Sequence, residues 1–174
     1  EFRRVLFRSF NGNYLKRDAV TFVDVLSKAG YKTSSVGKIH LQPMTTKSGY
    51  SWIKEDALGS IKEAWWPDKN DYTLEQQTHY EKDEYFDIPK PYYGFQNVDL
   101  VSEHGHGGNA HYIQWLRANL PDWEKYFDPK NEIPHNYSCK QAYRTPIPEE
   151  FYPTCFVEQK TVEFLNSIKK QSKP

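Results

Sequence analysis

The chain has 174 residues, of which 23 are basic and 23 are acidic, so its formal net charge is zero. A balanced charge provides no global attraction to nucleic acid or to anionic lipid, and the sequence has no apolar run long enough to span a bilayer. We therefore expect neither a nucleic-acid partner nor a membrane partner.

The composition predicts one incomplete domain whose core depends on aromatic side chains. Only 37% of the residues are hydrophobic, whereas 16% are aromatic. Few continuous apolar runs of the kind typical of buried parallel strands are present. We interpret residues 1–10 as a non-native or unassigned leader, because the first nine are basic and differ in character from the rest of the chain. Residues 11–174 are then one partial domain, and the compartment is left undetermined.

The first predicted element is an amphipathic helix over residues 19–29. Its apolar residues recur at steps of three and four, with Asp18 or Thr21 as the N-terminal cap and Gly30 as the C-terminal stop. The expected buried face consists of Phe22, Val25, Leu26 and Ala29. A short strand over residues 31–36 comes next, so the order is that of half a βαβ unit.

Residues 42–93 show little periodicity and are interpreted as an insertion that covers a cleft. We expect its acidic residues to be solvated and its aromatic residues mainly to pack the insertion. These aromatic residues, which could instead line a sugar-sized or aryl pocket, are Trp65, Trp66, Tyr72, Tyr80, Tyr85, Tyr92 and Tyr93.

The second half of the chain predicts one strand and two helices. A strand over residues 94–101 has Val98 and Leu100 on one face. A helix over residues 110–120, capped by Asn109, carries an apolar stripe of Tyr112, Trp115, Leu116 and Leu120. A loop over residues 122–150 leads to a last helix over residues 153–169. Its expected buried face consists of Val157, Thr161, Phe164, Leu165 and Ile168.

The sequence Gly37-Lys38-Ile39-His40 directly after the first predicted strand is the strongest candidate site. If the strand continues in extended form, Lys38 and His40 project to the same side. An ammonium and an imidazole next to a flexible glycine suit a bound oxyanion. The plainer alternative is a surface lysine beside a histidine with ordinary structural contacts.

The wider pattern Gly30-Tyr31-x-Thr33-x-x-Val36-Gly37-Lys38-x-His40-Leu41, preceded by an amphipathic helix, resembles the second signature of the sulfatase family in the alkaline-phosphatase-like superfamily. Further similarity lies in Asn11-Gly12, in His104-Gly105-His106-Gly107 and in Ile147-Pro148-Glu149-Glu150. The resemblance implies an α/β fold, namely part of an alkaline-phosphatase-like sandwich with a mostly parallel sheet and long irregular insertions. Residues 11–174 would then be an internal fragment of the N-terminal catalytic domain.

The resemblance also implies an activity, the hydrolysis of sulfate monoesters of a small molecule or glycan. In that family the nucleophile is a formylglycine made from the Cys or Ser of a Cys/Ser-x-Pro-x-Arg motif, and a divalent cation, usually calcium, assists it. Neither Cys139 nor Cys155 begins such a motif. The nucleophile and the cation ligands are therefore expected outside this chain, which alone should be inactive. By resemblance, Lys38 binds the sulfate as a catalytic residue and His40 assists the nucleophile, and the parent protein would be exported or periplasmic in the way that family members are.

Two alternative functions remain open. A phosphate or phosphonate monoester hydrolase of the same superfamily would use the same Lys38 and His40. A non-catalytic carbohydrate-binding module would account for the aromatic content alone. His104, His106 and His111 resemble a metal cluster, but we interpret them as a glycine-rich loop that enters a helix, since no cysteine or paired carboxylate completes the ligands.

Overall fold

The computed structural model describes residues 14–44, 69–82, 84–139 and 142–169. Within these ranges it contains helices α2 (Phe22–Lys28), α3 (His111–Asn119) and α4 (Pro153–Ile168) and strands β1 (Ser34–Gly37), β2 (Asn97–Ser102) and β3 (Asn109–Ala110). The α/β class predicted from the sequence is confirmed. The leader assigned to residues 1–10 and much of the predicted insertion, including Trp65 and Trp66, lie outside the described residues.

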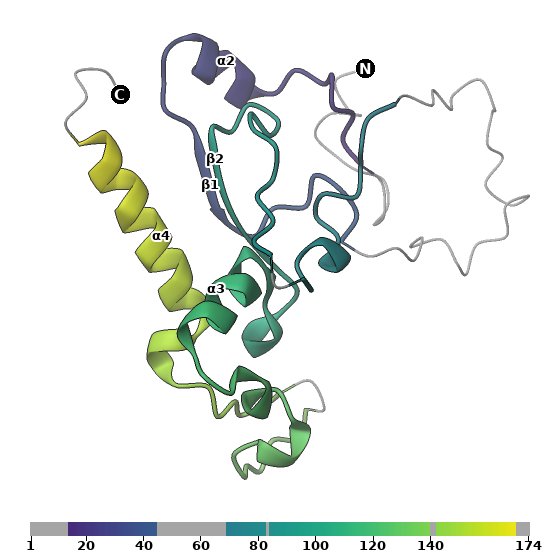
Figure 1. Cartoon of the computed structure of the whole chain (residues 1–174), viewed down its shortest axis with the longest axis vertical. Coiled ribbons are helices and arrows are strands. Elements are labelled where there is room, and N and C mark those ends of the chain that lie inside the picture. The colour runs from purple at the N-terminus through teal and green to yellow at the C-terminus, as the bar shows by residue number, and fades with distance from the viewer. Residues whose placement is uncertain (1–13, 45–68, 83, 140–141, 170–174) are drawn as a thin grey trace, which may run out of the picture.

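The sheet is small and mixed, with the strand order β1-β2-β3 (Figure 1). β1 pairs with β2 in parallel, with Gly37 opposite Leu100, whereas β2 pairs with β3 in antiparallel fashion. Val98 and Leu100 are buried on one face of β2, which confirms the predicted alternation. The parallel pairing brings the carboxyl ends of β1 and β2 to the same edge of the sheet.

Helix α2 begins at Phe22 rather than at residue 19, with Thr21, one of the two expected caps, at its N-terminus, and it ends before the expected stop at Gly30. Thr21 and Asp24 form a reciprocal capping box at the N-terminus. At the C-terminus, Gly30 has a φ of +95° and its N–H donates to the carbonyl of Ser27, while the N–H of Tyr31 donates to that of Leu26. These two bonds make a Schellman motif, which ends the helix.

The predicted buried face of α2 is wrong. Phe22 is 76% exposed and Val25 is also exposed, whereas Val23, on another side of the helix, is buried. Val23 is the buried residue because the first turn of α2 packs against the backbone of Gly94, which lies close to Val23 and Asp24. The apolar period located the helix but could not indicate which side the rest of the chain would cover.

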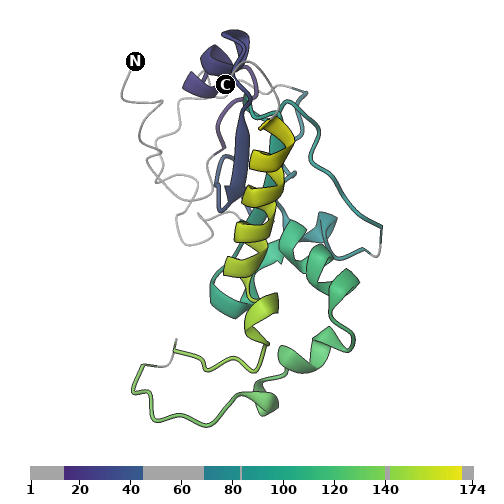
Figure 2. The same ribbon diagram turned by 90° about the vertical axis from the view of Figure 1, so that its left-hand side faces the viewer.

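Helices α3 and α4 begin and end close to the predicted positions. In α3, Tyr112 and Leu116 are buried as expected, but its N-cap is Ala110 rather than Asn109. Both residues form β3, which leads directly into the helix. Helix α4 runs along the sheet and packs against β1 and β2 (Figure 2). Its most buried residue is Phe156, which was not on the predicted face, while the predicted Leu165 is exposed.

The described part of the predicted insertion is largely built into the core. Leu74, Tyr80, Ile88, Tyr92 and Tyr93 are buried in the same cluster as Leu100 and Leu116. The prediction that these tyrosines serve mainly in packing is therefore confirmed for Tyr80, Tyr92 and Tyr93.

None of the described helices combines the length and the apolar character that crossing a membrane requires.

Replacing Gly94 tests the docking of α2. Gly94 has a φ of +86°, and a Cβ there would lie 2.5 Å from the backbone nitrogen of Asp24. We expect Gly94→Ala to lower the free energy of unfolding by at least about 2 kcal/mol, because the backbone strain of a positive φ adds to the overlap of the new Cβ with the backbone of Asp24. Urea denaturation measures this. Gly107→Ala is the matched control, because a Cβ at Gly107 meets no atom within 4 Å. Equal stability of the two variants would contradict the docking contact.

Candidate functional site

Lys38 lies where the two parallel strands end. It follows Gly37, the last residue of β1, and its exposed side chain reaches across to the end of β2. There its Nζ donates a hydrogen bond of 3.0 Å to the backbone carbonyl of Glu103, the residue directly after β2. The ammonium therefore lies at the carboxyl edge of the sheet, which is where open α/β sheets bind ligands.

The positive charge of Lys38 is not neutralised within the described residues. Its hydrogen-bond partner is a neutral carbonyl, and the salt bridges of the described chain involve other lysines. The nearby carboxylate of Glu103 instead accepts a hydrogen bond of 2.9 Å from Nε2 of Gln77. Lys38 consequently presents a positioned cation that can bind an anion.

The backbone turns at Gly37, where φ is +104°. This left-handed conformation requires glycine, although the space around it would admit a Cβ, whose nearest contact would be Val157 at 3.7 Å. Because the strand ends here, the alternation rule does not extend to Lys38 and His40. His40 is half-buried in the irregular segment after the strand. The catalytic roles of Lys38 and His40 stay predictions.

The segment after His40 is anchored by a buried carboxylate. Glu75 is fully buried, and its Oε1 accepts hydrogen bonds from the backbone N–H groups of Leu41 and Gln42 at 2.9 and 3.0 Å and from the hydroxyl of Tyr92 at 2.7 Å. The side chain of Gln42 in turn accepts a bond from the N–H of Leu74. This network fixes the chain directly after His40, while β1 fixes the chain before it.

The expectation of solvated acidic residues in the insertion is thus wrong for Glu75. Its carboxylate meets two backbone donors and a hydroxyl, which compensate for its removal from water. The same arrangement affects Tyr92. Burial, followed by the negative charge of Glu75, raises the pKa of the Tyr92 hydroxyl. Sequence reasoning missed Glu75, Gln77 and Glu103, because their contacts join segments far apart in the chain and leave no local pattern.

The three clustered histidines have different surroundings. His104 is exposed, and His106 stacks on Tyr143 with 4.0 Å between ring centroids. His111 is buried, and its Nδ1 accepts a hydrogen bond of 2.9 Å from the N–H of Leu100. Within the described ranges, no three His, Cys, Asp or Glu side chains gather closely enough to hold a metal ion.

Comparison of the chain with protein-family models, with curated proteins and with solved structures finds no match in any of the three.

The buried imidazole of His111 makes stability depend on pH. Burial lowers its pKa to about 4 from an ordinary value of 6.5, although Asp99 and Asp87 act in the opposite direction. Between these values the unfolded chain binds the proton and the folded chain does not. The contribution of His111 to the free energy of unfolding is therefore fully present above pH 6.5. It falls by about 3 kcal/mol as the pH drops toward 4.

Urea denaturation at several pH values measures this dependence, and His111→Gln isolates the contribution of the imidazole. A glutamine oxygen can still accept the N–H of Leu100 but does not titrate in this range. We expect the variant to lose most of the slope between pH 6.5 and 4. A slope that is identical in both proteins would show that other groups cause it.

Proposed function

We propose that this chain contributes part of the oxyanion site of a sulfuric ester hydrolase of the sulfatase family. The observation that carries the proposal is the ammonium of Lys38, which forms no salt bridge with the described residues and lies at the carboxyl ends of two parallel strands, within a segment that resembles a sulfatase signature. The parent domain would have an alkaline-phosphatase-like fold, with a sheet more extensive and more parallel than the three described strands. Its substrate would be a sulfated small molecule or glycan.

In this proposal Lys38 binds the sulfate oxygens. Its fixed charge offsets the negative charge that grows on the ester oxygens in the transition state, and a preoriented donor needs no reorganisation as that charge develops. The carbonyl of Glu103 holds the amine in place without neutralising it.

His40 would act on the proton of the nucleophile's hydroxyl, either orienting it or accepting it. Imidazole suits this task because it titrates near neutral pH. The Glu75 network supports the role, because it limits the movement of the chain directly after His40.

The formylglycine and the cation belong to the proposed parent protein. Bound calcium would supply positive charge to the sulfate and to the nucleophile. The described residues offer no ligand set for it, so none of the proposed steps depends on it.

Substitutions in the full-length protein test the two roles. We expect Lys38→Ala to lower kcat for hydrolysis of an aryl sulfate by about 100-fold or more, since a transition-state charge donor is lost. His40→Ala should cost a similar or larger factor, about 10²–10⁴. Steady-state kinetics measures both, with Lys32→Ala and His135→Ala as controls that retain wild-type rates.

Residues 1–174 alone should not hydrolyse the ester. Activity of the isolated chain, or full activity of both alanine variants at positions 38 and 40, would overturn the proposal. Parallel assays on matched sulfate and phosphate esters decide between the sulfatase and a phosphate or phosphonate hydrolase, because Lys38 and His40 do not select sulfur over phosphorus. A clear preference for the phosphate ester would replace the proposed substrate class.

A further inference from the structure

Glu103 directly follows β2 and contacts Lys38 through its backbone rather than through its charge. Its φ is +62°, in the left-handed region that residues other than glycine seldom adopt. Its carbonyl accepts the hydrogen bond of 3.0 Å from Nζ of Lys38. Strained backbone of this kind is concentrated at functional sites, where the surrounding contacts hold it in place. The turn therefore joins an ammonium to a residue that also carries a carboxylate.

The carboxylate of Glu103 is held by Gln77 instead of by Lys38. Its Oε1 accepts a hydrogen bond of 2.9 Å from Nε2 of Gln77. Gln77 is half-buried and lies between Leu74 and Tyr80, which are both buried in the core. The amide donor is therefore carried by a segment whose position the core fixes.

The observed pairing is one of two that these groups can form. A direct bond between the ammonium of Lys38 and the carboxylate of Glu103 would be charge-assisted and stronger than the bond to a neutral carbonyl. That pairing would leave the amide of Gln77 and the carbonyl of Glu103 with water as their partner, and an exposed ion pair contributes little free energy. The observed arrangement makes two hydrogen bonds in place of one ion pair, and it keeps the charge of Lys38 available.

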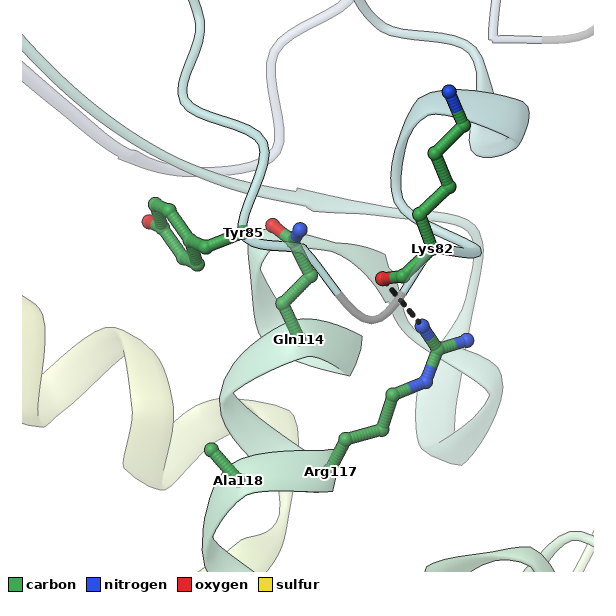
Figure 3. Close-up of a pocket in the computed structure, with 5 residues that line it drawn as sticks. All are labelled: Lys82, Tyr85, Gln114, Arg117 and Ala118. Carbon is green, nitrogen blue, oxygen red and sulfur yellow. Dashed lines mark hydrogen bonds between the residues drawn. The ribbon is translucent and has the colours of Figure 1, made fainter.

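Arg117 on α3 is also bound through carbonyls, but its surroundings differ. Its Nη1 donates to the carbonyls of Tyr80 at 2.8 Å and Lys82 at 3.5 Å. It lines a pocket of about 310 Å³ (Figure 3), and its guanidinium lies 5.1 Å from the centre of the Trp123 ring. Because an arginine also attracts anions, an anion titration must be read at the residues around Lys38 rather than from the whole chain.

We propose that Gln77 is a positioning residue of the anion site. By holding the carboxylate of Glu103 away from the ammonium of Lys38, it keeps that ammonium open to an oxyanion of the substrate. Loss of the amide donor would release the carboxylate, which the ammonium would then attract. The site would change from an available cation to an internal ion pair. This inference rests on the oxyanion-binding role proposed for Lys38, and it assigns no catalytic step to Gln77.

Titration of inorganic sulfate into the isotope-labelled chain at constant ionic strength measures the Kd from the amide shifts of residues 37–40. We expect Gln77→Met to bind sulfate about fivefold more weakly, because an exposed ion pair then competes with the anion. Gln76→Met is the matched control on the neighbouring residue. It should bind within about twofold of the original chain, since the hydrogen bond from Gln77 to Glu103 is kept.

Removing the charge of Glu103 separates this mechanism from a structural effect of Gln77. Glu103→Gln cannot form the ion pair, so the double variant Gln77→Met, Glu103→Gln should bind sulfate within about twofold of Glu103→Gln alone. A merely structural loss would persist in the double variant. Glu103→Asp is an independent test, because it keeps the charge and tolerates a positive φ but shortens the side chain, which breaks the bond to Gln77. We expect Glu103→Asp to weaken sulfate binding.

A backbone amide spectrum verifies the fold of each variant, and Glu103→Asp decides the matter if Gln77→Met does not fold. Equal sulfate affinity of Gln77→Met and the original chain would overturn the inference but leave the proposed function intact. A double variant that binds as weakly as Gln77→Met would have the same meaning. If the original chain itself binds no sulfate at residues 37–40, both the inference and the proposed oxyanion site are wrong.

Discussion

The parallel pairing of β1 with β2 is the feature that creates the candidate site. It places the ends of two strands that are distant in the sequence at one edge, with Gly37 opposite Leu100. The side chain of Lys38 can then span the gap to the carbonyl of Glu103. A neutral carbonyl orients the amine while its charge stays available. Had the carboxylate of Glu103 made this contact, the lysine would form an internal ion pair and the edge would attract anions much less.

The described part of the predicted insertion supports this edge of the sheet. Glu75 anchors the chain after His40, and Gln77 holds the carboxylate of Glu103. Both residues come from the same short segment, which packs into the core through Leu74 and Tyr80. The burial of Glu75 is therefore explained by its hydrogen bonds to backbone groups that would otherwise lack partners. The same segment leads to Tyr85 and the pocket beside α3.

Local signals in the sequence predicted what is local in the structure. The cap at Thr21, the stop at Gly30, the alternation in β2 and the start of α4 at Pro153 each depend on a few neighbouring residues. The orientation of α2 could not be predicted, because its period is compatible with more than one docking side and the backbone of Gly94 decides between them. For the same reason the sequence located Lys38 after a strand but could not identify Glu103, Gln77 or Glu75. These partners are defined by pairings between distant segments, for which a single sequence has no local pattern.

The proposed site requires that Lys38 present a positioned positive charge to a tetrahedral oxyanion. Titration of sulfate into the isotope-labelled chain, with amide NMR as the readout, measures this binding at individual residues. We expect saturable shifts at the amides of residues 37–40 and of Glu103, retained in Lys32→Ala and abolished in Lys38→Ala. Shifts that are the same with and without the Lys38 amine, or their absence from this edge of the sheet, would show that the lysine does not hold the anion.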